Sequence, residues 1–434
     1  MPQTRLKISV LGNGFFRSVG TLVSASVLGQ AILVAVAPIT TRLYGPADFG
    51  LFAVFTGVFS VLLVGSSLRY ELAIPQPRGE GNAVSLLRLS LSLNAIAATL
   101  VGMMVIFAGG TLSRLLNIPE MTSVLWLLPL AILGAGTYRA FNFWAIRQHN
   151  FGTMAHTKVV QSVVNATFQI GCGLIGSGAV GLILGQVLGL TAGAHRLSRN
   201  VNLDLMRWSR LGFLRMQHLA VRYSRFPKFD VAAALTDTLS VQLPNLLLTA
   251  LFTAEITGYY LLAERVLGVP LSLLSQSVGQ VFYARSRKAV EDGRITSLTM
   301  KVSATLAIIV IAPAMAVFFA GEPLFVLIFG DAWREAGIFA GWLIIGFAAQ
   351  FIFSSISLAL MATDAQKLNF FVHLCMLAAK AGALLYGYAV GSPLVGIIAF
   401  TLVNLVGYLG ATAVVVRHTR RYVLANTKSQ SIGN

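Results

Sequence analysis

Apolar runs of about twenty residues recur twelve times along this chain of 434 residues. A helix needs about 20 residues to cross a hydrocarbon core of about 30 Å, because each residue adds only about 1.5 Å of length. The runs cover residues 19–39, 49–70, 88–109, 121–143, 157–176, 178–195, 229–251, 257–282, 302–320, 336–360, 368–389 and 393–416. This pattern predicts an all-α polytopic membrane protein with about twelve transmembrane helices.

Composition supports a membrane location and excludes several other classes. Hydrophobic residues make up 56% of the chain and charged residues 11%, whereas soluble proteins carry about 25% charged residues. The net charge of +17 could suit a nucleic-acid-binding protein, but the basic residues gather at alternate ends of the apolar runs, so we expect no nucleic-acid partner. The two cysteines, Cys172 and Cys375, lie inside apolar runs and predict neither a disulfide framework nor a metal site.

The distribution of the basic residues sets the orientation. Of the 32 Lys and Arg residues, Arg42, Arg114 and Arg334 lie on one side, and Arg265 and Lys380 lie within the runs. The remaining 27 lie on the side of both termini. Cytoplasmic loops carry the excess of Lys and Arg in membrane proteins, so the sequence predicts that both termini are cytoplasmic.

The longest connection, residues 196–228, is basic and divides the chain into an N-terminal lobe of six runs (1–195) and a C-terminal lobe of six runs (229–434). If residues 205–226 form one helix, its arginines share one face and apolar residues lie opposite. Such a helix suits the anionic surface of the cytoplasmic leaflet, where membrane lipids would be its partners. A solvated linker broken at Gly212 is the alternative.

A polar segment, Ile39–Gly50, separates the first two runs, and we expect it to form a periplasmic turn of about a dozen residues. Pro38 precedes Gly50 by twelve residues, and Pro244 precedes Gly258 by fourteen. This faint echo between the two halves is typical of a parallel repeat related by an axis along the membrane normal.

Ionisable residues deep in a membrane span are costly and usually face the bundle interior. Lys380 is the strongest candidate, because it lies about 18 Å into the eleventh run, too deep to reach the headgroups easily. Its neighbours Ala379, Ala381 and Gly382 are small and leave room around the ammonium group. We therefore expect Lys380 to line a wet cavity, with a structural ion pair as the alternative.

Four further polar residues within the runs are candidates for a functional role: Glu264, Arg265, Asp237 and Gln30. Glu264 and Arg265 are adjacent in the eighth run, so their side chains point about 100° apart and address different neighbours. They have either a functional role or a role in interhelical pairing. Asp237 in the seventh run shares a helical face with Asn245, and its carboxyl either exchanges a proton or belongs to an ordinary polar cluster. Gln30 in the first run is a weaker cavity candidate.

Other charged residues lie near the ends of the runs. Arg69, Glu71 and Arg139 lie at cytoplasmic ends, where long side chains commonly extend to the headgroups. Four residues border the predicted periplasmic openings and are expected to pair when an outer gate closes: Arg42, Asp48, Arg334 and Glu335.

Several stretches resemble a known family. They are Thr41–Phe52 (TRLYGPADFGLF), Leu68–Pro75 (LRYELAIP), Tyr223–Phe229 (YSRFPKF) and the segment from Gly258 to Tyr283. With the twelve-run layout, they make the chain similar to the polysaccharide-exporter branch of the MOP flippase superfamily, the Wzx-type flippases of O-antigen and other lipid-linked oligosaccharides.

This resemblance implies two six-helix lobes around a central cavity in the bacterial inner membrane. It implies a lipopolysaccharide-type role: translocation of undecaprenyl-pyrophosphate-linked oligosaccharide by alternating access, with ion or proton coupling and with polysaccharide polymerase or ligase partners. Such a cargo needs a cationic cavity, because its diphosphate loses hydration in hydrocarbon. We assign substrate binding to Lys380, Arg265, Arg69, Arg139 and Gln30. We assign coupling or gating to Asp237, Glu264, Glu71, Arg42 and Asp48.

Three alternatives stay open. A MATE-type drug or cation antiporter is the first, although surplus cations in the cavity suit an anionic cargo better. A lipid II flippase is the second, although its relatives commonly carry two further spans. A membrane glycan polymerase or acyltransferase is the third, but the sequence shows no Walker A motif and no acid/base or nucleophile constellation. The sequence therefore predicts a transporter without a cofactor, not an enzyme.

Overall fold

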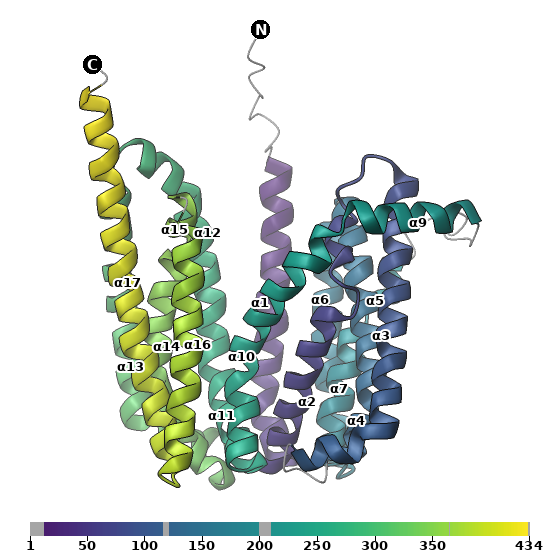
Figure 1. The fold of residues 1–434 in the computed structure, drawn as a ribbon. Helices are drawn as coiled ribbons and strands as arrows, with labels where there is room; N and C mark the ends of the chain where they lie inside the picture. The colour runs from purple at the N-terminus through teal and green to yellow at the C-terminus, as the bar shows by residue number, and fades with distance from the viewer. Residues whose placement is uncertain (1–12, 116–120, 199–209, 364, 433–434) are drawn as a thin grey trace. The chain divides into compact units, whose positions relative to one another are not determined.

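The chain folds into α-helices in a computed structural model that describes residues 13–115, 121–198, 210–363 and 365–432 (Figure 1). No β-strand occurs among these residues. Helices suit hydrocarbon because each backbone N–H and C=O finds its partner within the same segment. The predicted all-α polytopic fold is confirmed.

The first half of the chain contains these elements: α1 (Asn13–Leu43), α2 (Pro46–Gly65), the 3-10 helix η2 (Tyr70–Ala73), α3 (Glu80–Leu115), α4 (Thr122–Leu125), α5 (Leu127–Arg147), α6 (Phe151–Leu174), α7 (Ala179–Thr191) and α8 (Ala194–Ser198). The second half contains these: α9 (Arg210–Arg222), the π-helical η5 (Phe226–Asp230), α10 (Val231–Leu251), α11 (Ala254–Ala263), the π-helical η6 (Glu264–Gly268), α12 (Val269–Glu291), α13 (Ile295–Phe329), the 3-10 helix η7 (Asp331–Trp333), α14 (Arg334–Ile356), α15 (Leu358–Ala362), α16 (Gln366–Ala389) and α17 (Pro393–Ile432).

All twelve predicted runs lie on helices, with ends shifted by several residues. In the described part of the chain, ten helical segments are long and apolar enough to cross a membrane. The runs on α5 and α6 are outside this set because these helices carry many polar side chains. Neighbouring helices satisfy several of those polar groups: Tyr138 Oη lies 3.2 Å from Thr157 Oγ1, Asn165 Nδ2 donates to Gln186 Oε1 at 2.8 Å, and Gln169 Nε2 donates to Leu182 O at 3.2 Å.

The turn between α1 and α2 is much shorter than predicted. Only Tyr44 and Gly45 separate the two helices. Thr40 and Thr41 are helical, and their hydroxyls donate to backbone carbonyls one turn earlier, at 3.0 and 3.1 Å, so these polar groups are satisfied within the helix. Asp48 Oδ2 accepts a hydrogen bond from Gly45 N at 3.0 Å at the start of α2. The polar character of this segment therefore reflects helix ends, not a long loop.

Contacts divide the chain into two compact units, and the division differs from the predicted lobes. Unit 1 comprises the chain up to Tyr44 together with Val54–Gln242, and unit 2 comprises Gly45–Ala53 together with Leu243–Asn434. The boundary falls inside α10 instead of in the basic connection, because α9 and η5 pack against α3 and η2 of unit 1. The first turns of α2 belong to unit 2.

In unit 1, α1 packs on α6, α6 on α7 and α3 on α5. α9 lies across the end of α3 (Figure 1). Its Met216 and Leu219 enter a buried apolar cluster with Leu87 and Trp144 of the spanning helices. Part of the helix predicted at 205–226 is therefore present, and residues 205–209 lie outside the described residues.

α9 has a second apolar side. Phe213, Leu214 and Val221 are exposed at 46, 55 and 76%, whereas Met216 of the same helix is buried in unit 1. This helix is thus anchored to the protein on one side and presents apolar side chains on another.

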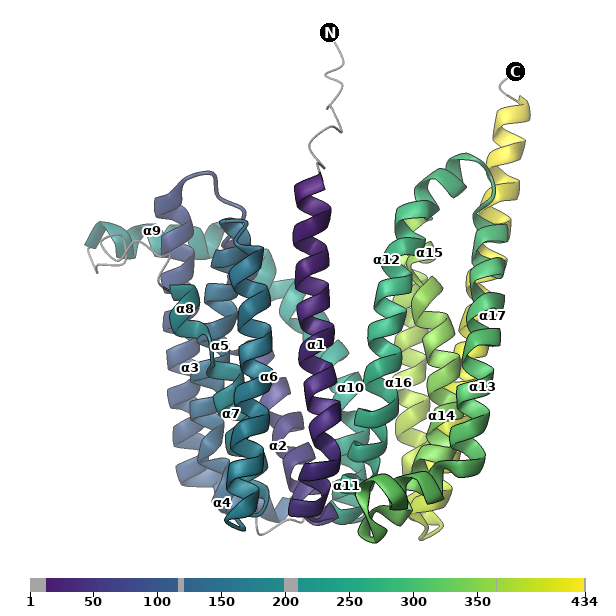
Figure 2. The ribbon, with the colours of Figure 1, turned by 180° about the vertical axis from the view of Figure 1, so that it is seen from behind.

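In unit 2, α14 packs against α13 and α17, and α17 packs against α16 (Figure 2). Trp333, fully buried, lies at the centre of the aromatic packing near the start of α14. Its ring is 4.8 Å from Phe49 of α2 and 6.2 Å from Tyr259 of α11, both edge-to-face. This aromatic packing binds the first turns of α2 to unit 2.

The first turns of α2 and α11 cross at two glycines. A Cβ on Gly50 would lie 1.7 Å from Ala254 O, and a Cβ on Gly258 would lie 1.9 Å from Pro46 O. Each glycine therefore faces the first residue of the other helix. Gly50 and Gly258, which the sequence pattern matches between the two halves of the chain, therefore contact each other's helices through the backbone.

We expect Gly50→Ala and Gly258→Ala each to lower stability by roughly 3 kcal/mol or more, the upper part of the range for overpacking, because the obstructing atom is backbone. The melting temperature of the purified protein in detergent measures this effect. Unfolding is monitored as the loss of the monodisperse peak in size-exclusion chromatography.

Gly171→Ala on α6 is the matched control, because no atom lies within 4 Å of its added Cβ. Alanine is favoured over glycine inside a helix by roughly 0.5–1 kcal/mol, so this variant should melt at the same temperature or slightly higher. Equal melting of Gly50→Ala and Gly171→Ala would contradict the crossing.

Candidate functional site

Unit 2 contains a cluster of ionisable side chains around η6, which interrupts the span formed by α11 and α12. Glu264 and Arg265 open this π-helical turn. Single π-helical turns inside α-helices are rare and frequent at functional sites. The extra residue in the turn changes the direction of the side chains on either side of it.

The two adjacent residues address different neighbours, as expected from their helical positions. The Glu264 carboxylate accepts a hydrogen bond from the side chain of Asn245 on α10, and it interacts electrostatically with Arg265 and Lys380. The Arg265 guanidinium lies 5.3 Å from the ring centroid of Phe52 on α2, within the range of a cation–π contact.

Lys380 extends from α16 to α17. Its Nζ donates to Tyr408 Oη at 3.1 Å and lies 5.1 and 5.7 Å from the ring centroids of Tyr408 and Phe400. The lysine is half-buried, and no carboxylate lies within ion-pair distance of it among the described residues. Two cations and one carboxylate therefore share this cluster, which leaves one surplus positive charge.

Unit 1 contains a second cluster where α2 ends. The Glu71 side chain on η2 is 1% exposed, and its Oε1 lies 2.7 Å from Arg139 Nη2 of α5. Ser67 Oγ donates to the other carboxylate oxygen, and Arg139 Nη1 donates to Leu63 O at 3.2 Å. Glu71 and Arg139, predicted separately, are thus partners in one buried ion pair.

The backbone beside this pair adopts an uncommon conformation. Leu68 and Arg69 have φ angles of 49° and 63°, and each such non-glycine residue costs about 1–3 kcal/mol. Arg69 is close enough to Arg139 for their charges to repel. The Nε of Arg69 is buried and has no acceptor among the described residues. This cluster also has two cations and one carboxylate.

The other predicted residues lie outside these clusters. Gln30 is half-buried on α1, Asp237 is exposed on α10, and Arg42 is exposed at the end of α1. Asp237 and Asn245 do not share one environment, because Asn245 is 4% exposed. Asp48 bonds to Gly45 N, as described above.

Arg334 is another of the residues that the sequence predicts to pair at the periplasmic openings. Arg334 pairs with Glu322 at 2.6 Å and with Asp331 at 3.3 Å. All three side chains are well exposed, so these contacts contribute little to stability.

Sequence reasoning missed the neutral partners. The sequence pairs Asn245 with Asp237 on one helical face, whereas in the structure Asn245 bonds to Glu264. Tyr408 and Ser67 were not predicted at all. A search for a polar residue on each helix at the depth of a buried charge would have found Tyr408, but the rotation of each helix was unknown.

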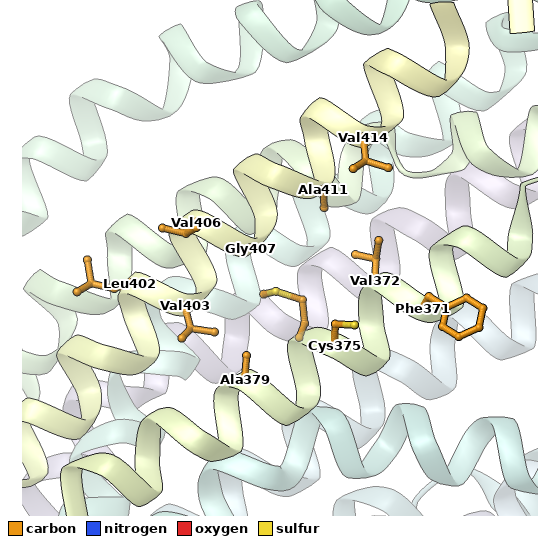
Figure 3. A pocket seen from close by; sticks show the side chains of 11 residues that line it. Phe371, Val372, Cys375, Ala379, Leu402, Val403, Val406, Gly407, Ala411 and Val414 are labelled. Carbon is orange, nitrogen blue, oxygen red and sulfur yellow. The ribbon is translucent and has the colours of Figure 1, made fainter. Parts of the chain in front are cut away.

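An apolar groove lies between α16 and α17 on unit 2, with a volume of about 640 Å³ (Figure 3). Its lining residues are Phe371, Val372, Cys375, Met376, Ala379, Leu402, Val403, Val406, Gly407, Ala411 and Val414. Phe371, Leu402 and Val406 are more than half exposed, so the groove opens at the surface of the unit. Hydrocarbon is the occupant that this lining suits in a bilayer.

Removal of one partner from the unit 1 ion pair should be strongly destabilising. We expect Arg139→Gln to cost about 3–5 kcal/mol, because it leaves the Glu71 carboxylate buried without its cation. Glu71→Gln combined with Arg139→Gln should recover part of that loss, since no buried charge remains. Melting temperatures of the two single variants and the double variant provide a double-mutant cycle. An additive cycle would show that the two side chains do not interact.

Comparison with known proteins places the chain in a family. A family model described as "Polysaccharide biosynthesis protein" matches residues 39–337, a range that begins in the last turns of α1. The succinoglycan biosynthesis transport protein ExoT of Rhizobium meliloti (strain 1021) is 25% identical over 387 residues, which are 88% of this chain and 76% of the relative.

Solved structures share the fold at low sequence identity. The lipid II flippase MurJ in an inward closed conformation matches with a TM-score of 0.68 at 12% identity, over 95% of this chain and 87% of that chain. An inward-facing MATE-family multidrug transporter of the MOP superfamily matches with a TM-score of 0.57 at 15% identity, over 94% and 96%. The predicted resemblance is confirmed: this multi-pass membrane protein has the fold of MOP-superfamily transporters and belongs to the polysaccharide biosynthesis protein family.

Proposed function

We propose that this protein is a polysaccharide exporter that carries undecaprenyl-pyrophosphate-linked oligosaccharide across the bacterial inner membrane by alternating access. The surplus of cations among the spanning helices of unit 2 carries this proposal. Lys380 and Arg265 outnumber Glu264, and Lys380 is held by aromatic groups and a hydroxyl. An anionic diphosphate would supply the missing negative charge.

The physical requirement for such a cluster follows from desolvation. A diphosphate and sugar hydroxyls lose their hydration in hydrocarbon, and each unsatisfied polar group costs several kcal/mol there. Guanidinium and ammonium groups replace that hydration with charge-assisted hydrogen bonds. In unit 1, Arg69 and Arg139 are the candidates for binding an anionic group, and Gln30 is the candidate for binding sugar hydroxyls.

The charge distribution supports the orientation. Lys and Arg favour cytoplasmic loops, so both termini would be cytoplasmic. α9 would then lie at the cytoplasmic headgroups, with Phe213, Leu214 and Val221 in contact with lipid. The family relationship supports polysaccharide polymerase or ligase enzymes as functional partners.

The carboxylates supply candidates for ion or proton coupling. Glu264 interacts with both cations of its cluster, so its protonation would change the charge that the cargo meets. Asp237 and Glu71 are the other coupling candidates, and Arg42 and Asp48 would contribute to gating.

Loss of the unit 2 cations should impair transport. We expect Lys380→Ala combined with Arg265→Ala to lower the initial rate of translocation of a fluorescent prenyl-diphosphate oligosaccharide in proteoliposomes at least tenfold, since each charge-assisted hydrogen bond contributes about 1.5–3 kcal/mol. Lys288→Ala, which removes an exposed lysine of the same unit, should leave the rate unchanged. An unchanged rate in the double variant would refute the cationic-cluster assignment.

The same proteoliposomes separate the two transporter classes. A polysaccharide exporter should move the anionic glycolipid and leave a cationic dye such as ethidium in place. Transport of ethidium without transport of the glycolipid would favour the MATE-type antiporter.

Neutralisation of Glu264 should uncouple transport from the proton gradient. We expect Glu264→Gln to remove the stimulation of glycolipid translocation by an imposed pH difference while slow movement down the cargo's own gradient persists. Asp292→Asn, which neutralises an exposed carboxylate of the same unit, is the matched control and should keep the full stimulation. Equal stimulation in wild type and Glu264→Gln would exclude Glu264 as the coupling group.

A further inference from the structure

Unit 1 contains a polar pocket of about 630 Å³ that none of the assignments above uses. It lies between the connection that follows η2 and the end of α5. Its lining residues are Pro75, Gln76, Pro77, Arg78, Glu80, Trp144, Arg147 and Gln148. Pockets of 300–1,000 Å³ are typical of small-molecule sites.

The pocket is preformed by Arg147. Its Nη1 donates to Pro75 O at 3.4 Å and also to Pro77 O, and its Nη2 donates to Arg78 O at 3.3 Å. Neutral carbonyls hold this guanidinium, and it makes no ion pair with a carboxylate in the described part of the chain. Its positive charge therefore remains available to an anion.

A buried donor in the pocket lacks an acceptor. Trp144 is 1% exposed, and its indole Nε1 has no hydrogen-bond partner among the described residues. A buried tryptophan N–H usually finds an acceptor. Arg78 supplies a second guanidinium, and its side chain is exposed. The pocket thus presents two cations and an unsatisfied N–H donor to one occupant.

The remaining side chains restrict the kind of anion. Glu80 places one carboxylate in the lining, which repels a bare polyanion and accepts hydrogen bonds from hydroxyl groups. The amides of Gln76 and Gln148 can exchange hydrogen bonds with hydroxyls as well. An occupant that combines one phosphate with several hydroxyls satisfies both kinds of group.

We propose that this pocket binds a phosphate that carries a hydroxyl-rich group, a sugar or a glycerol. Arg78 and Trp144 contact the phosphate oxygens, and Glu80 contacts the hydroxyls. Arg147 and Arg139 lie eight residues apart on α5, which is about 12 Å along the helix. The pocket and the Glu71–Arg139 ion pair therefore lie about two helical turns apart on the same helix.

The phosphate could belong to the lipid-linked glycan or to an anionic phospholipid, and the test separates these sources. In the first case the pocket is an additional subsite for the cargo and rests on the proposed function; in the second it is a lipid site independent of transport. Both cases are tested by ligand binding and not by transport. If the protein binds the phosphate ligand but does not translocate the lipid-linked glycan, the proposed function is refuted and the proposed binding site is not.

The experiment is calorimetric titration of the full-length protein in phosphatidylcholine nanodiscs with glucose 1-phosphate. We expect saturable binding that weakens about tenfold in Arg78→Ala, the loss of one charge-assisted contact. Arg225→Ala, which removes an exposed arginine of the same unit, should bind as the wild type does. Glu80→Gln should reduce the preference for glucose 1-phosphate over inorganic phosphate. Unchanged melting temperatures verify that the variants are folded.

Phosphatidylglycerol supplies the second arm. Nanodiscs that contain it are analysed by native mass spectrometry for retained lipid. Retention lost in Arg78→Ala, with no glucose 1-phosphate binding, supports the site with a phospholipid as its source. Equal affinity or retention in Arg78→Ala and Arg225→Ala would overturn the proposal, and so would the absence of binding in both arms.

Discussion

Hydrocarbon offers no hydrogen-bond partner, and this constraint determines most of the structure. It requires the backbone to be helical, and it makes a buried polar side chain costly unless the protein supplies a partner. Several hydroxyls and amides of α5, α6 and α7 bond to one another or to backbone carbonyls. Six of the charged candidate residues lie in two clusters, whereas Asp237 on α10 lies outside both.

Each cluster contains two cations and one carboxylate, but different backbone conformations position these side chains. In unit 1, the chain leaves α2 through two left-handed residues and a 3-10 turn, which bring Glu71 to Arg139. In unit 2, the helix continues, and the π-helical turn at Glu264 alters the direction of its side chains. The broken helix holds its carboxylate through several bonds, whereas the π-helical turn keeps the span of unit 2 continuous.

The sequence predicted the helices well because membrane spans require long apolar runs, and all twelve runs lie on helices. It predicted the charged members of the clusters, since Lys380, Arg265 and Glu71 are conspicuous in apolar surroundings. It did not predict their partners, because hydropathy does not give the rotation of each helix or the neighbour it faces. The turn after Leu43 was predicted too long because threonine and arginine at a helix end look like a loop when their hydrogen bonds are unknown.

The inward-facing polar side chains of α5 and α6 bear on the biogenesis of the protein. A segment enters the bilayer from the insertion machinery according to its own hydrophobicity, and these two are the predicted spans that are less apolar than the ten segments described above. Only Gln148, His149 and Asn150 separate them, so they are suited to enter together as a hairpin. In the structure α3 packs against α5, α1 packs against α6, and α7 packs against both. The ribosome makes α1 and α3 before this hairpin and α7 after it. Correct insertion of this half of the chain therefore depends on helices that assemble within the bilayer while synthesis continues.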